Sequence, residues 1–98
     1  MSEFLIDCNL HNAHSEAFME LIPSQRAIVN DLMFEGRILN YSVSMDRKKL
    51  WMVVTGENEE QVMELLSQFP LIDFMDVEIH PLLFHNSPQR SFAQISLN

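Results

Sequence analysis

The sequence predicts an α+β protein of ferredoxin-like βαββαβ order, in which two helices cover one face of a four-stranded antiparallel sheet. Short segments near both ends and in the middle of the chain alternate apolar with polar residues, as half-buried strands do. Two other segments repeat apolar residues at helical spacing, and each lies between segments of strand type. The 98 residues, 47% of them hydrophobic, fit one domain, expected over residues 1–86, followed by a polar C-terminal tail over residues 87–98.

The first predicted strand runs from Phe4 to Leu10. Its alternation directs one set of side chains toward the core and the other set toward the opposite face of the sheet. The core set is Phe4, Ile6, Cys8 and Leu10, and the opposite set is Leu5, Asp7 and Asn9. Cys8 is the only cysteine, so it cannot form an internal disulfide, and its place in the core set predicts a small buried residue.

The first helical segment extends from Ser15 to Glu35 and is interrupted by Pro23. Because proline has no N–H for an internal helix bond, we expect a short first turn and then a main helix that begins at Pro23. Gly36 suits the end of that helix, since glycine readily takes the left-handed conformation that closes helices.

The middle of the chain predicts a β-hairpin and a second helix. Residues 38–45 alternate, residues 50–55 are rich in strand-forming side chains, and a polar turn separates the two runs. Asn58 is a suitable N-cap for a helix whose apolar stripe extends to Phe69, and Pro70 would end this helix.

The last predicted strand covers residues 75–82 and turns Val77 and Ile79 toward the core, which leaves Glu78 and His80 on the opposite, open face. A carboxylate and an imidazole beside apolar residues would have the shifted pKa values that a general acid or base needs near neutral pH. A solvated sheet face shows the same alternation, so the plain structural reading stays open. A one-residue slip of the register would exchange the two faces.

Further residues are candidates for a ligand site. Arg26 is one of only six basic residues, and from the edge of a helix it could face an anionic ligand or simply solvent. His11 and His14, with Glu16 nearby, offer three potential metal ligands, but they fall in a strand-to-helix connection where a loop or capping role is expected, so we predict no metal site.

The net charge of −8 makes nucleic acid an improbable partner, because no stripe of lysine and arginine could neutralise a phosphate backbone. The chain has neither a long apolar run nor the pattern of a signal peptide, so we expect a cytoplasmic protein with no membrane association. Glycine-rich phosphate loops, paired cysteines and other cofactor motifs do not occur in the sequence, and we therefore expect no cofactor.

The open face of the predicted sheet also carries large apolar side chains. They are Leu5, Trp51, Val53 and Leu82. In so small a chain the simplest way to remove them from water is to pack this face against another subunit, so we expect a homodimer or a larger homo-oligomer. The tail over residues 87–98 would either lie across a neighbouring subunit or fray.

The stretch FPLIDFMDVEIHPLLFH, residues 69–85, together with the preceding EQVMELLSQ, resembles the end of a muconolactone delta-isomerase-like protein. Other segments correspond in order and spacing, and the resemblance covers about residues 3–88. They are Phe4-Leu5-Ile6, Asn30-Asp31-Leu32, Glu35-Gly36-Arg37 and His85.

The resemblance implies a dimeric α+β barrel assembled from ferredoxin-like chains, and a cofactor-free isomerase of aromatic catabolism that moves a proton and a double bond in a small lactone acid. Such a reaction needs a base and hydrogen-bond donors for the enolate-like charge. The resemblance then implies Glu78 or His80 as the base, Arg26 as the carboxylate anchor and Ser42 as a donor. Asp7 and Trp51 complete the expected substrate site.

Three classes of function remain open from the sequence. An isomerase requires a concave pocket in which Glu78 and Arg26 converge. A small-molecule binding module would have the pocket without the paired base and donor. A structural oligomer would fill the open face with side chains such as Trp51.

Overall fold

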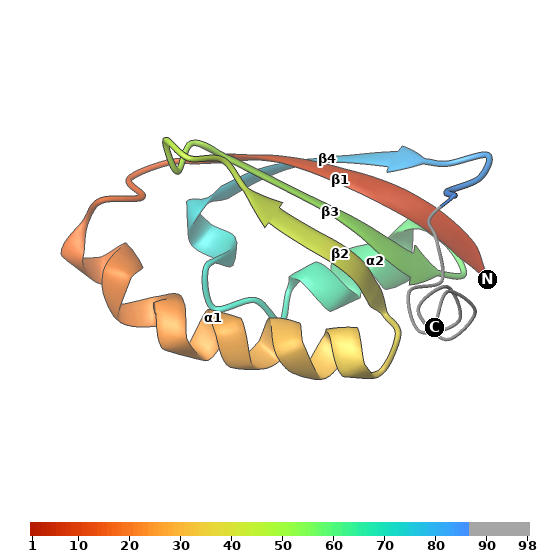
Figure 1. Ribbon diagram of the computed structural model, residues 1–98, viewed down its shortest axis with the longest axis horizontal. Coiled ribbons are helices and arrows are strands. Elements are labelled where there is room, and N and C mark those ends of the chain that lie inside the picture. The colour runs from red at the N-terminus through yellow and green to blue at the C-terminus, as the bar shows by residue number, and fades with distance from the viewer. Residues whose placement is uncertain (87–98) are drawn as a thin grey trace, which may run out of the picture.

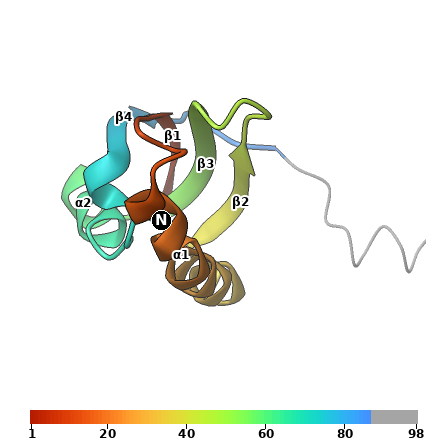
Figure 2. The same ribbon diagram turned by 90° about the vertical axis from the view of Figure 1, so that its left-hand side faces the viewer.

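The computed structural model describes residues 1–86, and it has the predicted α+β architecture. The four strands form one antiparallel sheet in the order β2-β3-β1-β4, and both helices cover the same face of it (Figures 1 and 2). The elements are β1 (Ser2–Leu10), α1 (Glu16–Phe34), β2 (Ile38–Val43), β3 (Lys49–Gly56), α2 (Glu59–Leu66), a 3-10 turn (Ile72–Phe74) and β4 (Met75–Pro81). The predicted tail over residues 87–98 lies outside the described residues.

Strand β1 is an inner strand, paired with β3 on one side and with β4 on the other. Its core set is buried as predicted, with Ile6 and Cys8 fully inaccessible to water. Burial, followed by the nearby carboxylate of Asp76, raises the pKa of the Cys8 thiol to about 11. This thiol is therefore neutral near physiological pH and serves as an apolar core group.

Helix α1 is continuous, so the prediction that the main helix begins at Pro23 is wrong. The helix begins one residue after Ser15, whose hydroxyl accepts a hydrogen bond from the backbone N–H of Phe18 at 3.2 Å. Apolar residues on both sides of Pro23 pack on one face of the sheet, among them Phe18 and Val29. This packing keeps Pro23 within the helix, on its exposed side. Because proline has no N–H, the carbonyl of Met19 lacks the helical hydrogen bond that residue 23 would otherwise donate.

The end of α1 is the predicted one. Gly36 has a φ of +77°, and the backbone N–H of Arg37 donates to the carbonyl of Leu32 at 2.9 Å. A second bond, from the N–H of Gly36 to the carbonyl of Met33 at 3.0 Å, completes the Schellman arrangement that closes many helices.

The predicted hairpin and second helix are present with small differences. Strand β2 departs from regular pairing between Ile38 and Asn40, and there the side-chain oxygen of Asn40 accepts from the N–H of Val53 at 3.0 Å. Asn58 caps α2 as predicted. The helix ends before Phe69, which is nevertheless buried, because two tight backbone turns carry the chain back toward the core.

Replacing Pro23 with alanine should raise the free energy of unfolding by about 1–3 kcal/mol, since alanine restores the missing N–H and removes the clash with the preceding turn. Urea unfolding followed by circular dichroism measures this change. Ser24→Ala, at the neighbouring exposed position, is the matched control and should change stability by about 0.5 kcal/mol or less. A Pro23→Ala variant less stable than the wild type would contradict this account of the helix.

Candidate functional site

Four of the six predicted site residues form one row across the open face of the sheet. Glu78 on β4 lies opposite Asp7 on β1, Asp7 lies opposite Trp51 on β3, and Trp51 lies opposite Ser42 on β2. Their side chains share a face because residues paired across antiparallel strands point to the same side of a sheet. His80 follows two residues after Glu78 and therefore joins the same face.

Lys49, the first residue of β3, neutralises one carboxylate of this row. Its ammonium nitrogen lies 2.6 Å from Oδ1 of Asp7 and 3.0 Å from Oδ1 of Asn9. Oδ1 of Asp7 is buried and makes no hydrogen bond of ordinary geometry, so we take the short contact as an ion pair rather than a directed bond. The ammonium also lies 6.0 Å from the centre of the Trp51 ring.

The carboxylates of Asp7 and Glu78 and the imidazole of His80 come close together. One ligand atom from each lies within 4.8 Å of the others, which is a spacing at which three such groups could surround one cation. Glu78 and His80 are exposed, so this group is open to solvent in the single chain. His11 and His14 form no comparable set within residues 1–86, and His11 instead lies 3.8 Å from Asp76.

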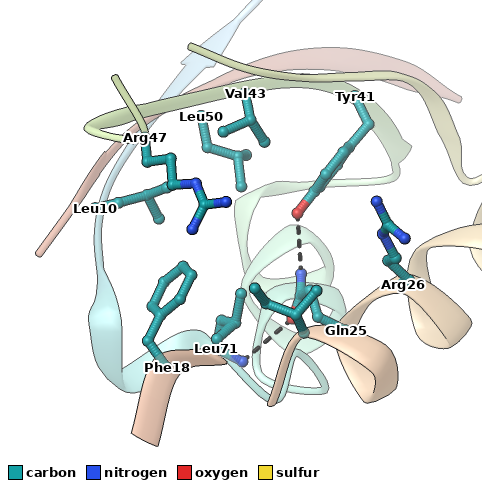
Figure 3. A pocket seen from close by; sticks show the side chains of 10 residues that line it. Leu10, Phe18, Gln25, Arg26, Tyr41, Val43, Arg47, Leu50 and Leu71 are labelled. Atoms are coloured by element: carbon teal, nitrogen blue, oxygen red, sulfur yellow. Dashed lines mark hydrogen bonds between the residues drawn. The ribbon is translucent and has the colours of Figure 1, made fainter. Parts of the chain in front are cut away.

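A cavity of about 230 Å³ lies on the other side of the sheet, between α1 and strands β2 and β3. We call it the α1 cavity, and Figure 3 shows its lining. Apolar side chains make most of the wall, and a few polar groups come from α1, from β2 and from the turn between β2 and β3. The lining residues are Leu10, Phe18, Ile22, Gln25, Arg26, Tyr41, Val43, Arg47, Leu50 and Leu71.

Two guanidinium groups reach this cavity from different elements. Arg26 belongs to α1 and Arg47 to the hairpin turn, and their side chains lie on opposite sides of the space (Figure 3). Neither forms an ion pair with a carboxylate of the described residues, although the chain has 14 acidic side chains. Two of only six basic residues therefore line one apolar cavity with their charge unneutralised, which suits a small anionic ligand.

Gln25 contributes to the wall of the cavity. It is the one buried polar side chain in the described part of the chain, at 3% exposure. Its amide nitrogen donates to the hydroxyl of Tyr41 at 3.2 Å, and its amide oxygen accepts from the backbone N–H of Leu71 at 3.2 Å (Figure 3). This side chain thus joins α1, β2 and the segment before β4. Burial raises the pKa of Tyr41, with the bond from Gln25 acting in the opposite direction, so the phenol is neutral near neutral pH.

Sequence reasoning found Arg26 but missed the rest of the polar lining. A signal for Gln25 was present, because it falls between Ile22 and Val29 at helical spacing, where an apolar residue is expected. Tyr41 and Arg47 carried no such signal, since only the folded hairpin brings them to α1.

The two groups of predicted residues do not converge within one chain. Arg26 lies on the face of the sheet covered by the helices, and Glu78 and its row lie on the open face. The alternation of side chains along each strand causes this separation. Tyr41 and Leu50 point toward the helices, while their neighbours Ser42 and Trp51 point to the open face.

The fold and the site define a small ferredoxin-like α+β protein with an apolar, cation-lined cavity beneath its first helix. The sequence matches the family model of muconolactone delta-isomerase over residues 3–88, and the chain belongs to this family. The fold is similar to a crystal structure of muconolactone isomerase at 3.3 Å resolution, with a TM-score of 0.68 and 19% sequence identity. That match covers 89% of this chain and 94% of the other, whereas no curated protein sequence matches the chain.

Replacing Gln25 with leucine should lower the free energy of unfolding by about 1–3 kcal/mol, because the N–H of Leu71 loses its buried acceptor. Urea titration at equilibrium measures the loss. Gln68→Leu, at an exposed position, is the matched control and should be nearly neutral. An unchanged stability of Gln25→Leu would mean that this bridge contributes little to the fold.

Proposed function

We propose that the protein binds a small lactone or carbonyl acid in the α1 cavity and isomerises it without a cofactor, by moving a proton and a double bond. Membership of the muconolactone delta-isomerase family supports the reaction class. The observation that carries the proposal is the pair of unneutralised guanidinium groups on an apolar cavity of about 230 Å³, which suits a ligand smaller than most drug molecules. Arg26 and Arg47 would hold the carboxylate.

A proton shift also needs a base, and the described residues that line the cavity include neither a carboxylate nor an imidazole. The resemblance implies Glu78 or His80 as the proton carrier, but both lie on the open face with Asp7, and the sheet separates them from a ligand in the α1 cavity. Binding without turnover is therefore a second candidate function, favoured by this separation of anchor and base within the single chain.

The two candidates are distinguished by incubating purified protein with muconolactone in deuterated water and following the reaction by proton NMR. We expect the wild type to exchange the acidic proton and form the isomeric lactone. Glu78→Gln tests a base on the open face, since kcat should fall by about 10²- to 10⁴-fold, the usual contribution of a positioned base, only if this face supplies the proton carrier. Arg26→Gln should mainly raise KM, because it removes uniform binding of the carboxylate.

Binding of the lactone without exchange or turnover would replace the isomerase by the binding module. If wild-type protein neither binds nor turns over the lactone, both candidates fall. A Glu78→Gln variant with unchanged kcat would exclude Glu78 as the proton carrier while leaving the isomerase reaction in place.

We also propose that the open face packs against a second copy of the chain. Leu5 lies on this face and is half-buried, and the Trp51 side chain is 38% exposed at the middle of the row. Packing two such faces together would remove these apolar groups from water and enclose the Asp7–Lys49 ion pair.

Trp51→Glu should weaken the dimer by about tenfold or more, since it would bury an additional carboxylate at the interface. Sedimentation velocity over a range of protein concentrations measures the dissociation. Phe34→Glu is the control, because Phe34 is 94% exposed at the end of α1, away from the open face. A wild type that is monomeric at all concentrations, or a dimer lost only with Phe34→Glu, would contradict the proposed interface.

A further inference from the structure

The hydrogen bonds around Gln25 have a defined direction. A backbone N–H can only donate, so the group of Gln25 that faces Leu71 must be its amide oxygen. The amide nitrogen then faces Tyr41 and donates to the phenolic oxygen. Tyr41 is consequently the acceptor in this bond, and its own hydrogen is not used there.

The hydrogen of the Tyr41 hydroxyl has no protein acceptor among the described residues, where the bond from Gln25 is the one polar contact of this group. Tyr41 and Gln25 both line the α1 cavity, and Figure 3 shows the Tyr41 hydroxyl directed toward Gln25, among the labelled lining side chains. Accepting a bond from Gln25 also polarises the O–H group and strengthens it as a donor. The free hydrogen is thus available to a molecule in the cavity.

The other polar side chains of the lining also offer hydrogen-bond donors to a ligand, and no free acceptor. Arg26 and Arg47 carry donors only, and the single amide oxygen of Gln25 is already paired with Leu71. The hydroxyl of Tyr41 adds one more donor, its O–H, while its oxygen already accepts a hydrogen bond from Gln25. The α1 cavity therefore presents donors to its ligand, and it complements a molecule whose polar atoms are acceptors, namely a carboxylate and a carbonyl.

We propose that the hydroxyl of Tyr41 recognises the ring carbonyl of the acid bound in the α1 cavity, and so selects lactone and keto acids over acids that lack a carbonyl. This proposal rests on the proposed function, since it takes the α1 cavity as the ligand site. During a proton shift next to that carbonyl the oxygen gains negative charge, and the same O–H would stabilise it. The raised pKa of Tyr41 keeps the proton on the phenol near neutral pH.

Two matched ligands test the selection. The saturated lactone (5-oxotetrahydrofuran-2-yl)acetic acid cannot shift a double bond, and (tetrahydrofuran-2-yl)acetic acid differs from it by the absence of the ring carbonyl. Calorimetric titration near neutral pH should show that wild-type protein binds the lactone acid about three- to tenfold more tightly, the value of one net hydrogen bond. Tyr41→Phe should bind both acids with the weaker affinity, and Arg26→Gln should weaken both by the same factor.

A second measurement avoids dependence on the folding of the Tyr41→Phe variant. Tyr41 is the only tyrosine in the chain, so protein labelled with ¹³C at the tyrosine ζ carbon gives one NMR signal from this phenol. Near neutral pH the lactone acid should shift this signal by more than the carbonyl-free acid does, because donation to the carbonyl further polarises the phenolic O–H.

The outcomes separate the two proposals. Equal affinity of the wild type for both acids, or a preference that survives in Tyr41→Phe, would overturn the role of Tyr41 and leave the proposed ligand site intact. If the wild type binds neither acid, the α1 cavity is not the ligand site, and the role of Tyr41 falls with it.

Discussion

The pairing of β1 with β3 and β4 is the constraint on which the rest of the structure depends. Because side chains alternate along each strand, this register decides at once which residues enter the core and which reach the open face. Ile6 and Cys8 become inaccessible to water, and the intervening Asp7 meets Glu78 and Trp51 on the other side. The buried core and the polar row are therefore two results of one register.

The covered face holds a different kind of site, which depends on a polar residue within an apolar stripe. Gln25 takes a position of α1 that normally contributes to the core, and both ends of its amide are paired there. Such a buried amide is tolerated only when its partners are in place, so it ties the orientation of α1 to β2 and to Leu71.

Charge distinguishes the two faces. On the open face Lys49 pairs with the carboxylate of Asp7, whereas the cavity holds two guanidinium groups without a carboxylate partner among the described residues. In a chain of net charge −8, this local excess of positive charge would allow the proposed acid to bind to a protein whose overall field repels it. The cavity and its two guanidinium groups lie on the covered face, whereas Glu78, which the resemblance of the last strand implies as a base, lies on the open face.

The sequence by itself determined the order of the elements and the alternation of side chains along β1 and β4, and with it the polar residues of the open face. It also determined the helix caps at Asn58 and Gly36. These features could be predicted because periodicity and capping are local properties of the chain. Tertiary structure decided the rest. The continuity of α1 through Pro23 follows from packing of the whole helix, which outweighs the local preference of one residue. The cavity joins Arg26, Tyr41 and Arg47 only after the hairpin folds against α1, and no pattern along the chain relates residues from separate elements in this way.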